Sequence, residues 1–310
     1  MIVALCGGVG AARLLRGMER AVGGASITAV VNTGDDTERF GLHVSPDLDT
    51  VMYTLAGRVD DGRGWGLAGE TWTVMDALEE LGGPTWFRLG DTDLATHFLR
   101  TERLATGATL TEVTAELCRS FGVGPRLLPV TDDRLRTMVR LRDGDEVPFQ
   151  DYFVRLRHAV PVSGVRFDGA GAARPGPAVL DALASADTIV VCPSNPVVSI
   201  GPLLAVPGVL DVLRHRRESV VGISPLVGGA ALKGPADRMM VELGGEASSA
   251  GIARGYAPWM GTLVIDETDA SDAPDVEAAG VRCHVAPTVM TTVDAAARLS
   301  ETALAAVGSR

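Results

Sequence analysis

The alternation of short apolar runs, turns rich in Gly, Ser or Asn, and helix-forming segments constrains the fold of this chain more than any other feature. The first apolar run, Ile2 to Leu5, leads into Gly7-Gly8 and then into helix-forming residues over 11–21. A second apolar run covers Ile27 to Val31. Two buried strands joined by a helix pair in parallel through a right-handed crossover. The N-terminal segment therefore predicts a βαβ unit.

The same alternation returns after residue 175. We expect helices over 177–186, 209–216, 235–243 and 293–307, and strands over 188–192, 219–224, 262–265 and 282–285. This order favours the α/β class, with a doubly wound, mostly parallel, Rossmann-like sheet.

The range 50–175 carries a different pattern. Helices are expected over 48–56, 71–81, 94–105 and 110–121, followed by a hairpin at Asp143-Gly144-Asp145. The sequence thus predicts a Rossmann-like nucleotide-binding core over 1–49 and 176–310, and a mainly helical insertion over 50–175 that covers a second ligand site.

Composition limits the partners of the chain. With 310 residues and 46% hydrophobic content it can build a large core, and its net charge of -11 argues against general nucleic-acid binding. No run of 18 apolar residues and no basic leader is present, which predicts a cytoplasmic protein without a membrane span. The four cysteines are widely spaced and lack a C-x-x-C pair, so reduced thiols are expected.

The first turn, GGVGAAR over 7–13, lies where a strand meets a helix N-terminus, which is a place that attracts phosphate. Gly8 and Gly10 would let an anion approach the backbone, and Arg13 would complement its charge. A merely tight βα turn remains the alternative. Because Arg13 replaces the third glycine of the dinucleotide fingerprint, and no G-K-[ST] follows, neither an NAD site nor a P-loop is indicated.

Carboxylates follow the second strand. Asp35 and Asp36 come directly after Asn32-Thr33-Gly34, and Asp49 begins the next helix within SPDLDT. Such hard oxygen ligands suit Mg²⁺, which in turn bridges phosphate oxygens. Taken singly, these residues are also explained by helix capping through Asp47 and by a turn at Asp35.

Three further polar loops follow predicted strands or begin helices. The segment RLGDTDLATH carries Asp91, Thr92 and His97, and could equally be a capped surface helix. CPSNPVVSIG carries Ser194 and Asn195, and SPLVGGAALKG carries Gly228, Gly229 and the only lysine, Lys233. Because ordinary connections do not need this set of side chains together, the loops predict ligand binding at the carboxyl edge of the sheet.

In combination these segments resemble one family. GGVGAARLL, VNTGDD, HVSPDLDTVMYTLAG, RLGDTDLATH, CPSNPVVSIGP and SPLVGGAALKGPAD occur here in the order found in the 2-phospho-L-lactate transferases of coenzyme F420 biosynthesis, which include phosphoenolpyruvate transferases. The resemblance implies transfer of a phosphoenolpyruvyl or 2-phospho-L-lactyl group from a guanosine diphosphate ester to the ribityl hydroxyl of the deazaflavin Fo (7,8-didemethyl-8-hydroxy-5-deazariboflavin). The products would be (dehydro) coenzyme F420-0 and GMP.

The resemblance also implies roles for the loops. Asp35 and Asp49 would be catalytic Mg²⁺ ligands, with Asp36 as an alternative ligand. The donor would be held by the following residues: Gly8, Gly10, Arg13, Ser194, Asn195, Gly228, Gly229 and Lys233. Fo would contact Tyr53, Trp86, Asp91, Thr92 and His97.

Other functions stay open at this point. A nucleotide-binding regulator of gluconeogenesis factor type could use the same sheet without chemistry. An NAD-dependent oxidoreductase is disfavoured, because the second strand ends in Asn32-Thr33-Gly34 and not in an acidic ribose ligand. Thr37 to Phe40 and Arg88 vary within the family, so the choice between the two donor acids is not predicted. A homodimer is expected because C2 dimers are the commonest assembly.

Overall fold

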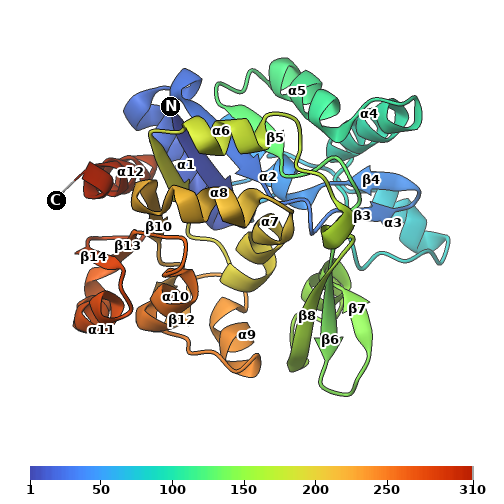
Figure 1. Cartoon of the computed structure of the whole chain (residues 1–310). Helices are drawn as coiled ribbons and strands as arrows, with labels where there is room; N and C mark the ends of the chain where they lie inside the picture. The colour runs from blue at the N-terminus through green and yellow to red at the C-terminus, as the bar shows by residue number, and fades with distance from the viewer. Residues whose placement is uncertain (309–310) are drawn as a thin grey trace.

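The computed structural model describes residues 1–308 and places seven strands in one central sheet (Figure 1). From edge to edge they are β14 (Arg282–Val285), β13 (Thr262–Ile265), β10 (Val220–Ile223), β9 (Thr188–Val191), β1 (Ile2–Cys6), β2 (Ile27–Val31) and β5 (Arg126–Pro129). All neighbouring strands in this sheet pair in parallel. The predicted α/β class and doubly wound parallel sheet are confirmed.

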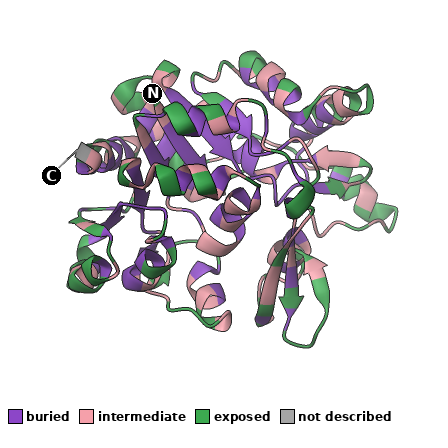
Figure 2. Ribbon diagram, in the orientation of Figure 1, coloured by how far each residue is buried: buried purple, intermediate pink, exposed green. Residues whose placement is uncertain are grey.

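Helices cover both faces of the sheet, which leaves its inner strands buried, whereas the edge strand β14 is mostly exposed (Figure 2). Val3 and Leu5 belong to one core and Ala4 to the other, because alternate side chains of a strand point to opposite faces. The helices that pack on the Val3 face are α6 (Val179–Ser185), α8 (Val209–His215), α10 (Ser249–Tyr256) and α11 (Ala273–Ala278). Those on the Ala4 face are α1 (Gly8–Val22), α2 (Pro46–Leu55), α5 (Leu110–Phe121) and α12 (Val293–Gly308).

The winding direction reverses between β1 and β9. The chain leaves β1 through α1 on one face and leaves β9 through α7 (Gly201–Ala205) and α8 on the other. The loops after these two adjacent strands therefore diverge, which opens the crevice where α/β sheets of this kind bind ligands.

Between β2 and β9 the chain also forms the outer structure around that crevice, in addition to α2, α5 and α6 on the sheet. It holds α3 (Thr73–Glu80), α4 (Asp93–Ala105), and the small hairpin of β3 (Thr37–Arg39) and β4 (Leu42–Val44). It also forms a three-stranded antiparallel arm that projects from the body, made of β6 (Arg136–Leu141), β7 (Glu146–Pro148) and β8 (Val162–Asp168) (Figure 1). Antiparallel pairing of β6 with β7 confirms the hairpin expected at Asp143-Gly144-Asp145. β5 also falls within 50–175, and it nevertheless pairs with β2 in the central sheet.

The remaining elements are short. They are β11 (Leu226–Val227), β12 (Ala230–Ala231), α9 (Ala236–Glu242) and helical turns at Gly24–Ser26, Asp151–Arg155, Ala170–Ala172, Pro196–Ile200, Arg217–Ser219 and Glu267–Asp272.

The four cysteines are free, as expected, and three are buried while Cys283 is half-buried. Over residues 1–308, no single helix has the length and apolar character to span a membrane. One bent pair, Pro196–Ala205 with Val209–His215, passes that test by length and composition.

Candidate active site

Two adjoining cavities lie at the carboxyl edge of the sheet. The large cavity has a volume of about 610 Å³ and the small cavity about 200 Å³. Both are lined by Val9, Gly10, Pro193, Asn195 and Lys233, so these residues form their common border. The crevice predicted from the sheet topology is therefore a two-part site.

The glycine-rich turn forms the side of the border that belongs to β1 and α1. Gly8, the first residue of α1, has a positive φ of 76°, which favours glycine. A Cβ on Gly10 would lie 2.5 Å from the backbone oxygen of Pro193, so only glycine lets α1 approach the loop after β9 this closely. Across the same crevice the Ser194 hydroxyl donates a hydrogen bond to the Gly7 carbonyl at 2.8 Å.

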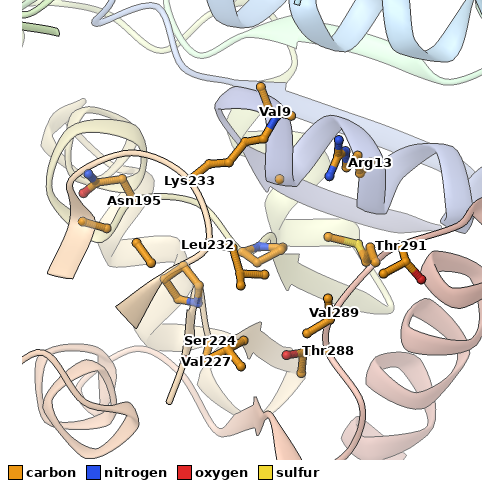
Figure 3. Close-up of a pocket in the computed structure, with 16 residues that line it drawn as sticks. Val9, Arg13, Asn195, Ser224, Val227, Leu232, Lys233, Thr288, Val289 and Thr291 are labelled. Carbon is orange, nitrogen blue, oxygen red and sulfur yellow. The ribbon is translucent and has the colours of Figure 1, made fainter. Parts of the chain in front are cut away.

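Figure 3 shows the small cavity, in which Lys233 reaches toward Val9 while Arg13 lies on α1. The Asn195 carboxamide oxygen accepts a hydrogen bond from the Val197 amide at 2.9 Å, which fixes its side chain beside the border. The opposite wall comes from the chain after β14: Thr288, Val289, Met290 and Thr291.

Gly228 and Gly229 do not line either cavity, although their neighbour Val227 lines the small one. The Gly228 amide donates to a carboxylate oxygen of Asp269 at 3.0 Å, so it holds the loop in shape. The structure therefore brings together six of the eight residues predicted to bind the donor, and leaves these two glycines outside the cavity walls.

Two buried carboxylates, Asp35 and Asp47, line the large cavity. Burial and then the charge of Asp47 raise the pKa of Asp35 well above its usual range. Burial raises the pKa of Asp47 to about 6, against the opposing effect of hydrogen bonds from Asn32 and the Gly8 backbone. Within residues 1–308, Asp35 Oδ1 has no hydrogen-bond partner. This end of the cavity thus concentrates negative charge that is only partly compensated.

Asp36 lies beside this pair without lining either cavity. One of its oxygens, Oδ2, accepts a hydrogen bond from the Ser45 hydroxyl at 2.9 Å and lies 3.0 Å from His43 Nε2. Its other oxygen, Oδ1, is buried and has no hydrogen-bond partner in the described part of the chain.

Asp49 lines the large cavity from the start of α2 and is paired with Arg100 of α4. Arg100 Nη1 donates to Asp49 Oδ2 at 3.1 Å, and Nη2 donates to Oδ1, so the pair is bidentate. Burial acts to lower the pKa of Arg100, but the carboxylate of Asp49 more than offsets this and the net shift is upward. Arg100 was not among the residues predicted from the sequence.

A second buried group adjoins Asp49. The Tyr53 hydroxyl donates to Asp93 Oδ1 at 2.6 Å, and His97 Nε2 lies 3.4 Å from the same oxygen. Burial acts to raise the pKa of Asp93, but its contacts with His97 and Tyr53 outweigh this and lower it. Tyr53, Asp93 and His97 all line the large cavity, and Tyr53 and His97 are among the residues predicted to contact Fo.

The other three residues predicted to contact Fo do not line the cavity. Trp86 lies under the Arg39 guanidinium, whose carbon is 4.2 Å from the ring centroid. Asp91 accepts hydrogen bonds from the Thr73 and Val74 amides at 2.9 and 3.0 Å, so it caps the start of α3. The Thr92 amide donates to Glu70 at 2.8 Å. These contacts give Trp86, Asp91 and Thr92 structural roles around the cavity.

Several lining residues of the large cavity were not predicted from the sequence. They come from the glycine-rich loop after α2, the segment before α4, and the end of the projecting arm: Arg63, Trp65, Phe87, Arg88, Leu89, Phe149, Gln150, Phe153 and Val154. Their aromatic rings and aliphatic groups make this cavity suitable for a flat apolar ligand.

The donor atoms present fit a hard cation such as Mg²⁺. Asp35 and Asp36 each carry a buried carboxylate oxygen without a partner, and such oxygens are the ligands that Mg²⁺ prefers. Among residues 1–308, no group of three or more His, Cys, Asp or Glu side chains is arranged to hold a metal alone. Mg²⁺ commonly binds one or two carboxylates and completes its shell with water and substrate phosphates.

Comparisons with known proteins identify the family of this chain. Residues 2–302 match the model of the family described as 2-phospho-L-lactate transferase CofD. A phosphoenolpyruvate transferase of Kitasatospora aureofaciens is 47% identical, covering 98% of this chain and 97% of its own length. One of the same name from Streptomyces griseus is 48% identical with the same coverage.

A solved structure from Bacillus halodurans, protein BH3568, superposes with a TM-score of 0.63 at 18% identity and covers 98% of both chains. At that identity it supports the fold only. The family match spans nearly the whole chain, and the phosphoenolpyruvate transferases are similar over their full length. This chain therefore belongs to the 2-phospho-L-lactate transferase CofD family and is a transferase.

Proposed function

We propose that this transferase moves a phosphoenolpyruvyl or 2-phospho-L-lactyl group from a guanosine diphosphate ester to the ribityl hydroxyl of Fo, within coenzyme F420 biosynthesis. The observation that carries the proposal is the pair of joined cavities. A small cavity with polar and basic groups shares the Gly10 and Lys233 border with a larger one lined by aromatic rings and carboxylates. One nucleotide and one flat acceptor fit this division.

The donor would lie across the border. Its diphosphate would meet the start of α1 at Gly8 and Gly10, because helix N-termini attract anions. Arg13 and Lys233 would balance its charge, and the guanosine would occupy the small cavity beside Asn195, with Ser194 next to it in the wall of the large cavity. The loop of Gly228 and Gly229 would shape that cavity from outside.

The acceptor would lie in the large cavity. Tyr53, His97 and the newly identified aromatic residues surround a volume suited to a deazaflavin ring. Trp86, Asp91 and Thr92 would support this wall through the contacts that hold the arm, α3 and α4 in place.

Mg²⁺ would be held by Asp35, with Asp49 as the second carboxylate and Asp36 as the alternative. When bound, it would neutralise phosphate charge and help to align the reacting groups. The chain itself supplies the fixed backbone amides, Arg13 and Lys233 for the same purpose.

The reaction needs in-line positioning and charge neutralisation, without a covalent enzyme intermediate. The ribityl oxygen bonds to the β-phosphorus and loses its proton to solvent. The bond from that phosphorus to the bridging oxygen breaks, and GMP leaves with the electron pair. The product is a phosphodiester that joins Fo to the three-carbon acid.

The experiment combines this protein, Fo, GTP, Mg²⁺ and a donor-forming guanylyltransferase, with phosphoenolpyruvate and 2-phospho-L-lactate in separate reactions. Mass spectrometry is expected to detect a new Fo phosphodiester together with GMP, and the faster acid identifies the donor. Absence of product with both acids, once donor formation is verified, would contradict the proposal. It would favour a nucleotide-binding regulator of gluconeogenesis factor type, which binds GDP and leaves Fo unchanged.

Removal of the Lys233 ammonium is expected to weaken donor binding. In Lys233→Ala the donor KM and the dissociation constant of GDP should each rise by about tenfold or more, the scale of one hydrogen bond to a charged group. Fo affinity should change little. Calorimetric titration with GDP measures the effect directly.

Arg214→Ala is the matched control. Arg214 lies in the last turn of α8, lines neither cavity and pairs with the exposed Asp211 at 3.3 Å. Equal GDP affinity in Lys233→Ala and Arg214→Ala would contradict the role of Lys233.

The homodimer remains a prediction, and light scattering of the purified protein at several concentrations tests it.

A further inference from the structure

Arg100 is the largest fully buried side chain in the described part of the chain. It lies directly behind the wall of the large cavity. It is 1% exposed and lines neither cavity. No ligand can therefore reach it without movement of the wall, and its effect on a reaction must pass through another residue.

The guanidinium connects three elements. It forms the bidentate pair with Asp49 of α2 from its own helix α4, and Nη1 also lies 3.4 Å from His97 Nδ1 and 3.5 Å from the carbonyl oxygen of His43 in β4. Asp49 and His97 line the large cavity. Arg100 thus holds two cavity side chains from behind.

Stability alone is a weak reason for such a pair. Taking two charges out of water is costly, and well-packed apolar residues of similar volume often serve a fold equally well. A guanidinium, in contrast, fixes both oxygens of a carboxylate, which a lysine or an apolar residue cannot do. The buried charge of Arg100 is therefore better explained by its effect on the orientation of Asp49.

We propose that Arg100 is a positioning residue that fixes the orientation of the Asp49 carboxylate at the wall of the large cavity. This inference rests on the proposed function, because it assumes that Asp49 serves the transfer reaction and Mg²⁺. Groups that hydrogen-bond to a metal-binding carboxylate fix its orientation, and their loss typically reduces metal affinity or activity about 10- to 100-fold.

The first test replaces Arg100 by Ala and by Lys and measures kcat, donor KM and GDP affinity. In Arg100→Ala kcat should fall about 10- to 100-fold, with GDP affinity within about twofold of wild type. Lys should recover only part of the loss, because it supplies one point charge and no fork. Truncation to Ala opens a space beside the cavity wall, so guanidinium ion added at non-denaturing concentration should occupy that space and restore activity to Arg100→Ala, but not to Arg100→Lys, whose side chain still fills it.

Arg103→Ala is the matched control. Arg103 lies one turn further along α4, and its side chain is 40% exposed and pairs with Glu102 and Glu116. We expect unchanged kcat in this variant and no effect of guanidinium.

A second test does not depend on turnover or on the folding of Arg100→Ala. Asp49→Asn and Asp49→Asn/Arg100→Gln both lack the charge on Asp49, and the double variant leaves no unpaired buried charge. Calorimetric titration with Mg²⁺ in the presence of GDP should give equal affinities for the two, both weaker than wild type. Arg100→Gln alone should weaken Mg²⁺ binding about as much as Asp49→Asn.

The inference would be overturned if Arg100→Ala had the kcat of wild type and did not respond to guanidinium. It would also be overturned if Arg100→Gln bound Mg²⁺ as tightly as wild type. A wild-type enzyme that makes no Fo product would instead overturn the proposed function, and the Mg²⁺ titrations would still decide whether Arg100 acts through Asp49.

Discussion

Asp35→Asn is expected to lower kcat/KM by about 10³-fold, the scale for losing one preorganised electrostatic group in an active site. The same variant should be more stable than wild type when no Mg²⁺ is present. Asp35 is buried, its Oδ1 has no partner, and burial together with Asp47 raises its pKa. The neutral amide keeps the shape and removes that unfavourable charge, so Tm should rise by several degrees.

The pH dependence has a definite sign. A carboxyl whose pKa is raised in the folded state stabilises the fold at low pH, below its unfolded pKa, and that contribution is lost as pH rises through the folded pKa. For Asp47 this window runs from its ordinary value of 3.8 to about 6. The metal-free wild type should therefore lose stability as pH rises over this window. The loss should continue at higher pH, because the pKa of Asp35 is also raised. Asp35→Asn should lose less stability over the same range.

Thermal unfolding with and without Mg²⁺ measures both effects, and Asp211→Asn on the exposed face of α8 is the matched control. Near-normal turnover in Asp35→Asn would contradict the assignment of Asp35. If Asp35→Asn had a lower Tm than wild type without Mg²⁺, this would contradict the conclusion that the charge of Asp35 is unfavourable.

Gly10→Ala is expected to weaken GDP and donor binding by more than about tenfold, and to lower the free energy of unfolding by about 1–3 kcal/mol, as overpacking of a close contact does. The added Cβ would lie 2.5 Å from the Pro193 backbone oxygen, so α1 and the loop after β9 must separate. That movement separates the two sides of the cavity border. Calorimetry with GDP and chemical denaturation measure the two losses.

Gly255→Ala is the control for the substitution. Gly255 lies in α10, and a Cβ there meets nothing within 4 Å. Its GDP affinity should equal that of wild type, and its stability should rise slightly because Ala favours a helix by up to about 1 kcal/mol over Gly. If Gly10→Ala bound GDP as tightly as wild type, the close approach of α1 to Pro193 would be unnecessary for GDP binding.

Local patterns predicted the central elements of the fold correctly. The runs Ile2 to Leu5 and Ile27 to Val31 are strands because their side chains are apolar apart from Thr28 and each run leads into a turn that contains glycine, which is typical of a parallel sheet buried on both faces. β5 was missed because its four residues, RLLP, are too few to show a period and end in proline. Its place in the sheet comes from pairing with β2, which the sequence alone does not display.

The site was predicted in part for a similar reason. Gly8, Gly10, Ser194 and Asn195 follow strands, and the carboxyl ends of parallel strands lie at the same edge of the sheet whatever the intervening chain does. Asp91 shows the limit of this reasoning. An acidic residue before a helix is common to caps and ligand sites, and the structure uses Asp91 to cap α3, a different helix from the one that follows it.

Arg100 could have been found from its spacing. Asp93, His97 and Arg100 are four and three residues apart, which places them on one face of α4. That the face is buried against Asp49 depends on how α4 packs on α2, and this was beyond the sequence.

The most direct test of the account is a reaction of wild-type protein, donor and Fo carried out in water enriched in ¹⁸O, with mass spectrometry of both products. Direct transfer predicts GMP and Fo phosphodiester in equal amounts, neither carrying the label, and no such products from Asp35→Asn over the same time. Labelled GMP, or labelled phospho-acid without an Fo phosphodiester, would show that water accepts the group and would contradict transfer to Fo.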